Sequence, residues 1–170
     1  LLAPILRLNA SAARFDFRRV SFTHKGVAGP LGTCSPESFA AGETYLPRPE
    51  DIFVATQMKC GTTWMQQLVY ETLSRGQGDL SDSGHGHLYS VSPWIDAVNS
   101  VSLEKAPLVG RPPRRIIKCH LPTAICPYSP DAKYVYVTRH PVSCFASILD
   151  YNRSLLGPLT LSMAATANWF

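Results

Sequence analysis

Three side chains that suit the binding of a charged ligand stand shortly after short apolar runs of the sequence. They are Lys59, His120 and Arg139. Lysine offers a point charge, and arginine offers a planar fork of donors that matches phosphate-like groups. Histidine adds an imidazole that titrates near neutral pH. Together, these three residue types are typical of a site that holds an anion.

The apolar runs before these residues predict strands that bring them together. Asp51–Thr56, Arg115–Cys119 and Lys133–Thr138 are short and rich in β-branched or aromatic residues, as buried strands are. Helical patterns alternate with them, which predicts an α/β fold with a parallel sheet and flanking helices. Ligands of such sheets bind beyond the carboxyl ends of the strands. We therefore expect the three side chains at one edge of the sheet.

The helical patterns can be placed one by one. The first begins at Thr62 and ends at Arg75–Gly76, where a cation and a glycine are typical of a helix C-terminus. Its expected buried face consists of Trp64, Met65, Leu68, Val69, Thr72 and Leu73. Further helices are expected from Pro141 and over residues 158–170. Ser92–Pro93 predicts the start of a short helix.

Composition and charge narrow the class of protein. The chain has 170 residues, a net charge of +4 and a pI near 8.9, which fits one domain with an anionic ligand. Residues 1–46 show no regular pattern, so we expect an irregular segment followed by a domain over residues 47–170. The arginines of residues 111–115 form too short a cluster to predict a nucleic-acid surface. No apolar run reaches the roughly 18 residues that predict a membrane span.

The cysteines predict a reducing environment. The chain has five, an odd number, and no C-x-x-C pair. This pattern argues against a disulfide framework and against a zinc site, and it favours the cytoplasm. His85 and His87 form an H-x-H pair in a Gly/Ser-rich loop without further ligands nearby, so no metal is predicted. The oligomeric state is not predicted.

The junction Lys59–Trp64 has the residues of a phosphate-binding loop. Gly61 stands at the turn into the predicted helix, where main-chain N–H groups converge and the helix dipole favours an anion. Thr62 and Thr63 can add hydroxyl donors or cap the helix. The ATP-binding pattern G-x-x-x-x-G-K-[ST] is not met, because the lysine precedes the glycine. The loop is predicted to bind phosphate in a different manner from that of ATPases.

Three runs resemble the motifs of one family, the cytosolic-type sulfotransferases. Thr56–Trp64 resembles the family's 5′-phosphosulfate loop, usually T-Y-P-K-S-G-T-T-W. Ile117–Pro122 is similar to its catalytic-histidine segment. Tyr134–Pro141, with Ser147 eight residues after the arginine, resembles its 3′-phosphate motif. The three runs also follow one another along the chain in the same order as in the family. The resemblance implies a P-loop-like core that binds 3′-phosphoadenosine 5′-phosphosulfate (PAPS).

The resemblance assigns the cofactor contacts residue by residue. Main-chain N–H groups over residues 61–64 hold the 5′-phosphate, and the hydroxyls of Thr62 and Thr63 assist. Cys60 stands where the family has serine and can donate only weakly. Trp64 either lies against the adenine or packs in the helix core. The implied partners of the 3′-phosphate are Arg139 and Ser147.

The same resemblance implies the chemistry. His120 is the general base that takes the acceptor's proton, and its ordinary pKa near 6.5 leaves a neutral fraction at neutral pH. Lys59 stabilises charge on the oxygen that leaves the sulfur, and Lys118 assists. The acceptor is expected to be a small alcohol, phenol or amine, with no metal required. Trp94 and the loop over residues 76–87 are the candidate parts of its binding site.

Some features depart from the family pattern and keep alternatives open. Gln57, Met58 and Cys60 replace the usual Tyr, Pro and Ser. The later Arg-Lys-Gly loop that also holds the 3′-phosphate has no counterpart, so the chain is expected to be truncated and the isolated domain poorly active. The alternatives are a P-loop-type nucleotide-dependent phosphotransferase and a non-catalytic nucleotide-binding fragment.

Overall fold

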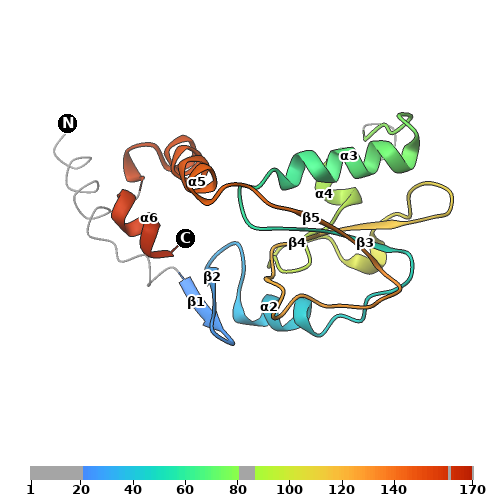
Figure 1. The fold of residues 1–170 in the computed structure, drawn as a ribbon, viewed down its shortest axis with the longest axis horizontal. Helices are drawn as coiled ribbons and strands as arrows, with labels where there is room; N and C mark the ends of the chain where they lie inside the picture. The colour runs from blue at the N-terminus through green and yellow to red at the C-terminus, as the bar shows by residue number, and fades with distance from the viewer. Residues whose placement is uncertain (1–20, 81–86, 161, 170) are drawn as a thin grey trace.

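A three-stranded parallel sheet forms the centre of the fold (Figure 1). The computed structural model describes residues 21–80, 87–160 and 162–169. Strand β3 (Asp51–Thr56) lies between β4 (Arg115–Cys119) and β5 (Lys133–Val137), and both pairings are parallel. The three predicted strands are confirmed, although the last ends one residue earlier than expected.

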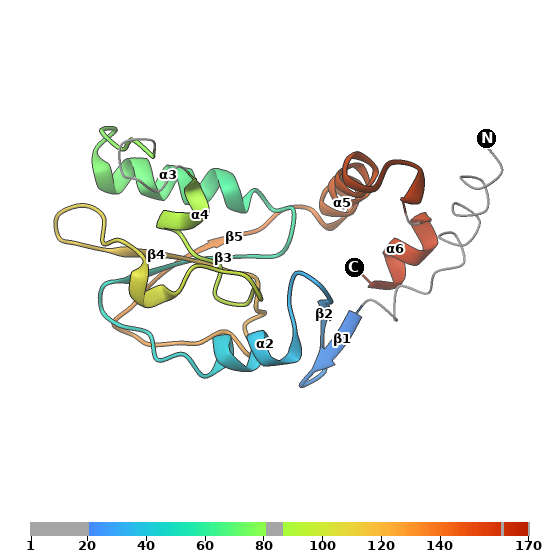
Figure 2. The ribbon, with the colours of Figure 1, turned by 180° about the vertical axis from the view of Figure 1, so that it is seen from behind.

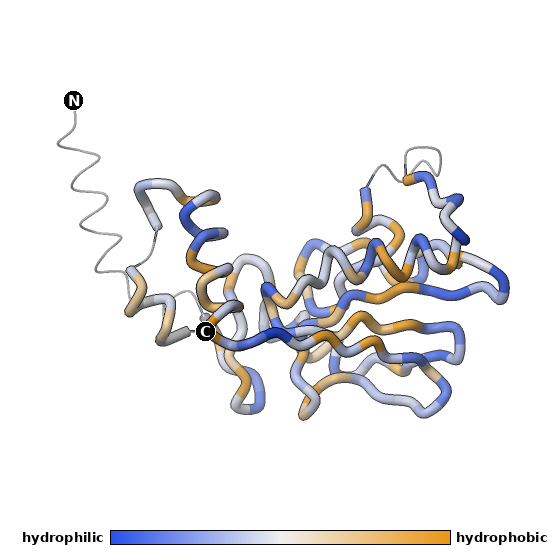
Figure 3. Tube along the Cα trace, turned by 45° about the horizontal axis from the view of Figure 1, so that its top comes forward, coloured by the Kyte–Doolittle hydropathy of each residue, from blue (hydrophilic) through white to orange (hydrophobic). Residues whose placement is uncertain are grey.

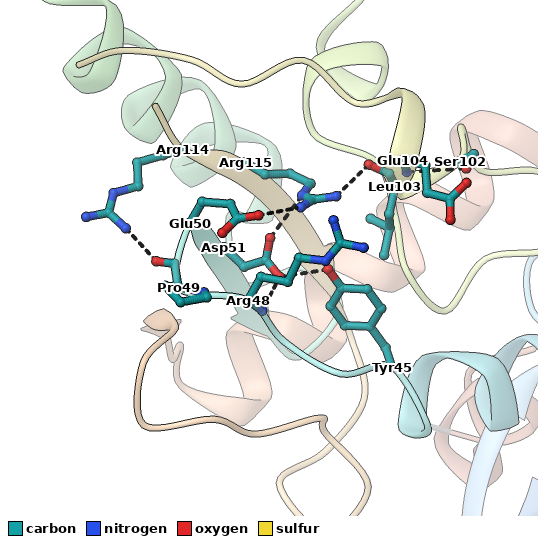
Figure 4. A network of polar contacts seen from close by, with 10 residues as sticks. All are labelled: Tyr45, Arg48, Pro49, Glu50, Asp51, Ser102, Leu103, Glu104, Arg114 and Arg115. Carbon is teal, nitrogen blue, oxygen red and sulfur yellow. Dashed lines mark hydrogen bonds and ion pairs between the residues drawn. The ribbon is translucent and has the colours of Figure 1, made fainter. Parts of the chain in front are cut away.

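A buried ion pair sets the register at the amino end of the sheet (Figure 4). Asp51 and Arg115 are register partners, and Nε of Arg115 donates to Oδ1 of Asp51 at 2.9 Å. The second oxygen, Oδ2, accepts from the hydroxyl of Tyr45 at 2.7 Å and from the main-chain N–H of Arg48 at 2.8 Å. A slip of one residue would separate these two buried charges from each other. The pair therefore keeps the carboxyl ends of β3 and β4 level.

Helix α3 (Thr62–Ser74) covers one face of the sheet, next to the short helix α4 (Leu88–Val91). Val54 and Ile116 of the sheet form a core cluster with Tyr70 of α3 and two side chains from α4. The apolar side chains around this cluster are Met65, Val69, Leu73, Leu80 and Val109. Figure 3 shows the hydrophobic residues concentrated along the central strands.

The buried face of α3 agrees with the predicted one only in part, because Met65, Val69 and Leu73 pack against the core but other predicted residues do not. Its fully buried residues are Thr62, Gln66 and Tyr70, whereas Trp64 and Leu68 are 85% and 57% exposed. Gln66 was not among the residues predicted to be buried. In the structure its side-chain amide is satisfied inside the protein by bonds to Ser92, so the helix can turn this residue inward.

The opposite face of the sheet is covered by residues for which no regular structure was predicted. A hairpin of β1 (Ser21–His24) and β2 (Val27–Pro30) precedes helix α2 (Pro36–Glu43). Phe39 of α2 packs in a core cluster that includes Phe53, Ile117 and Cys119 of the sheet. The expectation of an irregular segment therefore fails over residues 21–43, and residues 1–20 lie outside the described part.

Two local signals mark these elements in the sequence. Lys25 and Gly26 both have positive φ, 48° and 81°, and form the two-residue turn between β1 and β2. Ser35 caps α2 in a reciprocal pair with Ser38, and Pro36 stands in its first turn. The second partner of a capping box is usually Glu or Gln, so Ser38 gave a weak signal.

The predicted short helix at Ser92–Pro93 is absent. Ser92 ends α4, and the chain then runs alongside β4 in an extended form, with Trp94 paired in parallel to Lys118. The main-chain N–H of Lys118 donates to the carbonyl of Pro93 at 2.9 Å, and that of Ile95 donates to the carbonyl of Lys118 at 2.9 Å. Pairing with a strand from a distant part of the chain outweighs the local capping pattern.

Helix α5 (Pro141–Leu156) follows β5 and lies, with α6 (Met163–Trp169), beyond the end of the sheet at which β5 finishes (Figures 1 and 2). A short 3₁₀ helix, η3 (Gly157–Leu159), separates them, and another, η2 (Leu103–Lys105), precedes β4. The helices predicted from Pro141 and after residue 158 are thus both present. Strand β5 is less covered than expected, because Tyr136 is 69% exposed.

Candidate functional site

The loop between β3 and α3 forms the anion-binding end of the site. Lys59 and Gly61 have positive φ, 63° and 94°, and Gly61 is the N-cap of α3 with no side chain bonded to it as a cap. The first N–H groups of a helix have no partner within it. Alternation of left-handed and right-handed backbone conformations before the helix turns such N–H groups toward one concavity. A Cβ added at Gly61 would meet no atom within 4 Å, so space remains beside these donors. The loop can hold a phosphate.

The side chains of the first turn of α3 point in different directions. Oγ1 of Thr62 is buried and lies 2.5 Å from Oγ1 of Thr56, so this hydroxyl is engaged inside the protein. Thr63 is exposed, and it interacts with the hydroxyl of Tyr89. Trp64 is 85% exposed, which excludes the helix-core alternative for this residue and leaves its ring available to a ligand.

Three contacts join the phosphate loop to the end of β5 and to α5. Nη1 of Arg139 donates to the carbonyl oxygen of Lys59 at 3.1 Å. Nζ of Lys59 lies 4.2 Å from the centre of the Tyr151 ring, a cation–π contact. The third contact is between the buried thiols of Cys60 and Cys144, whose sulfur atoms are 3.4 Å apart. Lys59 and Arg139 are therefore brought together as predicted, while the thiol of Cys60 faces α5.

His120 is held at the carboxyl end of β4 in a defined tautomer. Its Nδ1 lies 2.7 Å from the carbonyl oxygen of Thr56. A carbonyl only accepts, so Nδ1 carries the proton and Nε2 presents a lone pair. No bond to Nε2 occurs within the described part of the chain. Burial, followed by the charge of Lys118, lowers the pKa of His120 to about 4 from its ordinary value of 6.5. The imidazole is neutral at pH 7.

Lys118 lies in an aromatic enclosure two residues before His120. Its Nζ is 3.6 Å from the centre of the Trp94 ring and 4.8 Å from that of Tyr89, and the residue is only 5% exposed. Burial lowers the pKa of Lys118, while its interactions with Tyr89 and Asp96 act in the opposite direction. The rings and these partners stabilise a desolvated ammonium close to the imidazole.

A cavity of about 210 Å³ opens beside His120, between the sheet and the β1–β2 hairpin. Its apolar lining consists of Val27, Ala28, Pro30, Phe39, Met58 and Pro122. Gln57 and Asp96 add polar atoms. The site thus has an anion-binding end at α3 and an apolar cavity on the other side of the imidazole.

The other predicted residues are placed as follows. Ser147 lies on α5, partly exposed, and no contact within the described residues joins it to Arg139 or to the loop. Trp94 packs its ring edge-on against His120 at 5.0 Å, but it is not part of the cavity lining. Residues 81–86 of the second predicted acceptor segment lie outside the described part.

Several residues of the site were missed by sequence reasoning. Tyr151 and Tyr89 enclose the lysines, and Thr56 and Asp96 hold the histidine. One signal was available for Asp96, an isolated acidic residue between Ile95 and Ala97. Such a residue in an apolar stretch indicates a buried carboxylate with a specific partner.

Comparison with known proteins decides which family contains this arrangement. The model of the sulfotransferase domain matches residues 49–167. The chain belongs to the sulfotransferase family. It is 32% identical over 149 residues to mouse sulfotransferase 2B1, covering 85% of this chain and 42% of that protein. It is 28% identical over 136 residues to rat sulfotransferase 1C2, covering 76% and 45%. This sulfotransferase chain spans less than half the length of these relatives.

Solved structures agree on the fold. The crystal structure of mouse sulfotransferase SULT7A1 complexed with PAP matches with a TM-score of 0.61 and 21% identity, covering 89% of this chain and 51% of that one. The predicted α/β fold and the suggested family are confirmed. None of the helices within the described residues is long and apolar enough to cross a membrane. All five cysteines are free thiols.

Proposed function

We propose that this sulfotransferase chain binds PAPS and contributes to the transfer of its sulfuryl group to an acceptor hydroxyl or amine, with His120 as the general base. One observation supports this most directly. An uncapped helix N-terminus and an imidazole whose Nε2 has no bond to the described residues lie at the same edge of the sheet. Membership of the sulfotransferase family supports the proposal, and one structural neighbour was crystallised with PAP.

The residues present fit such a nucleotide. Its charge would be met by main-chain donors at Gly61 and the first turn of α3, by Lys59 and by Arg139. The open space beside Gly61 and the exposed ring of Trp64 leave room for a phosphate and a base. PAPS, when bound, supplies the sulfuryl group that is attached to its 5′-phosphate.

The roles of the side chains follow from their surroundings. Thr56 fixes the tautomer of His120, so that Nε2 takes the proton of an acceptor held in the apolar cavity. Because the pKa of His120 is lowered to about 4, the base form is present at neutral pH before any ligand binds. Lys59 and Lys118 add positive charge where the leaving oxygen gains negative charge. The apolar lining favours a small alcohol, phenol or amine with an apolar body.

Ligand-dependent thermal unfolding tests the nucleotide part of this proposal. PAP, adenosine 5′-phosphate and ATP with Mg²⁺ are each added at about 100 times an expected Kd. A ligand specific to the folded state stabilises by about 2.7 kcal/mol, or about 5–10 °C for a chain of this size. We expect the largest increase in Tm with PAP. A preference for ATP with Mg²⁺ would identify a phosphotransferase, and PAP binding without transfer by the natural full-length protein would identify a non-catalytic binder.

A matched pair of variants tests the part of Arg139. Arg139→Ala removes a charged, bidentate donor, which is typically worth about 1.5–3 kcal/mol, or about 10- to 100-fold in Kd. We expect this loss for PAP and little change for adenosine 5′-phosphate, measured by calorimetry. Arg153→Ala is the control, because Arg153 is an exposed cation of α5 paired with Asp150. Equal losses for both nucleotides in Arg139→Ala would contradict the assignment.

A further inference from the structure

The chain before Asp96 pairs with the outer edge of β4 through one isolated bridge. Lys118 and Trp94 are paired in parallel, with main-chain bonds to Pro93 and from Ile95. In a regular parallel ladder the next bond would run from the N–H of His120 to the carbonyl of Ile95. Instead, this N–H donates to Oδ1 of Asp96 at 2.9 Å. A carboxylate takes the place of a main-chain acceptor at the residue proposed as the base.

Asp96 is an unusual choice for a purely structural acceptor. Its exposed fraction is 0%, and burial raises the pKa of its carboxyl to about 6 from 3.8. The thiol of Cys34 lies 3.9 Å from Oδ2, and the hydroxyl of Ser38 donates to the main-chain carbonyl of Asp96 at 2.7 Å. A neutral amide could accept the bond from His120 without this cost of burial. The main-chain N–H of His120, then Trp94 and then the charge of Lys118 act against burial and lower the pKa of Asp96.

The positively charged group among these is Lys118. The attraction between the Asp96 carboxylate and the Lys118 ammonium stabilises both charged forms. Burial opposes the protonated form of Lys118, whereas its interactions with Tyr89, Asp96 and Cys34 favour it. One carboxylate thus holds the main chain of His120 and helps to keep the neighbouring lysine charged.

The segment is also fixed at its other end, to the helix of the phosphate loop. Nε2 of Gln66, a fully buried residue of α3, donates to the main-chain oxygen of Ser92 at 3.2 Å and to its hydroxyl at 2.9 Å. The five residues 92–96 therefore connect α3 to the end of β4. A shift of Asp96 would move His120 relative to the anion-binding loop.

We propose that Asp96 is a positioning residue of the transfer reaction, which holds His120 through its main chain and Lys118 through its charge. This inference rests on the proposed function of the site. It assigns a role to a fully buried side chain that bonds to the main chain of His120 and not to its imidazole. Its removal is expected to affect turnover and to leave nucleotide binding unchanged.

Two variants of the natural full-length protein separate the effect of the Asp96 charge from that of its bond to the main chain of His120. Asp96→Asn keeps the shape and an acceptor for His120 but removes the charge, and Asp96→Ala removes both. The assay uses PAPS with 4-nitrophenol as the acceptor, or a simple alcohol or amine if the wild-type protein turns that acceptor over faster. We expect kcat to fall about 10²-fold in Asp96→Ala. We expect a fall of about 10-fold in Asp96→Asn. The affinity for PAP should stay within about 3-fold in both.

The dependence of kcat on pH gives a second readout, which would not change if Asp96 had a purely structural role. Without the Asp96 charge, Lys118 loses its proton more readily, so the alkaline limb of kcat should shift to lower pH in Asp96→Asn. This measurement decides the question if Asp96→Ala does not fold. Ser38→Ala is the control, because it removes the bond to the Asp96 carbonyl and leaves the carboxylate in place. It should lower stability by about 1 kcal/mol without changing kcat.

The outcomes are distinguishable from failure of the proposed function. If the wild-type protein neither binds PAP nor transfers a sulfuryl group, the function itself is wrong. If the wild-type protein is active and both Asp96 variants keep its kcat and its alkaline limb, Asp96 is a structural residue only. An increase in the KM for PAPS at unchanged kcat would also overturn the inference.

Discussion

Removing either of two neighbouring groups, Asp96 or His120, should change the pH dependence of stability in opposite directions. Burial raises the pKa of Asp96 to about 6 from 3.8, and burial with the Lys118 charge lowers that of His120 to about 4 from 6.5. The folded chain thus binds the Asp96 proton more tightly than the unfolded chain does. The Asp96 contribution to stability is present at low pH and is lost as pH rises through 6. The His120 contribution is present above pH 6.5 and is lost as pH falls toward 4.

The magnitudes follow from these pKa values. Each pH unit of difference is worth about 1.4 kcal/mol when fully expressed. Between pH 7 and pH 5, the Asp96 carboxyl gains about 1.5 kcal/mol of stabilisation by protonation, and His120 loses about 2 kcal/mol. The second value is an upper limit, because His120 keeps part of its surface exposed to water. In the wild-type chain the two contributions nearly cancel.

Urea unfolding of near-isosteric variants at pH 7 and pH 5 measures each contribution. Relative to the wild type, Asp96→Asn should lose about 1.5 kcal/mol of unfolding free energy on going to pH 5. His120→Asn, whose amide can still donate to the carbonyl of Thr56, should gain up to about 2 kcal/mol. Asp150→Asn controls for the loss of one exposed charge and should change by less than about 0.5 kcal/mol. If the unfolding free energy of Asp96→Asn changes between the two pH values by the same amount as that of the wild type, the carboxylate is not buried as described.

Two further predictions concern the lysine of the loop and the cysteines. Lys59→Met should reduce kcat by about 10²-fold and weaken PAP binding less than about 10-fold, because the contact strengthens as the leaving oxygen gains charge. Steady-state assays in excess EDTA and calorimetry would check this, and a loss confined to affinity would contradict it. Iodoacetamide at pH 7.5 should modify Cys126 first, by peptide mass spectrometry, because a bond with the Cys119 thiol lowers the pKa of the partly exposed Cys126. Burial raises the pKa of Cys34 to about 12 and of Cys60 to about 11, so faster labelling of either would refute the reasoning.

The strands were predictable because their signal is local. Each is a short run rich in apolar residues, and each is followed by residues that the parallel order brings to one edge. The phosphate loop was predictable for the same reason, since Gly61 supplies both the turn and the start of α3. Lys59 and Arg139 do converge there.

What could not be predicted depends on partners from distant parts of the chain. Gln66 is buried only because Ser92 satisfies its amide, and Ser92 starts no helix because the residues after it pair with β4. Hydrophobic periodicity assigns Gln66 to the exposed face, and the capping pattern of Ser92–Pro93 holds no information on β4. The role of Asp96 was hidden in the same way, because its partners are more than twenty residues away.

The two ends of the site differ in how much sequence change they can accept. At the anion-binding end, ligand contacts come mainly from the main chain of a loop whose shape depends on Gly61. The thiol of Cys60 faces Cys144, so a cysteine in place of the family's serine leaves the donors of α3 unchanged. At the other end, side chains hold the imidazole on two sides, Thr56 through its carbonyl at Nδ1 and Asp96 at the main-chain N–H. Asp96 is the side chain whose identity matters there, because another residue would alter either the position of His120 or the charge beside it.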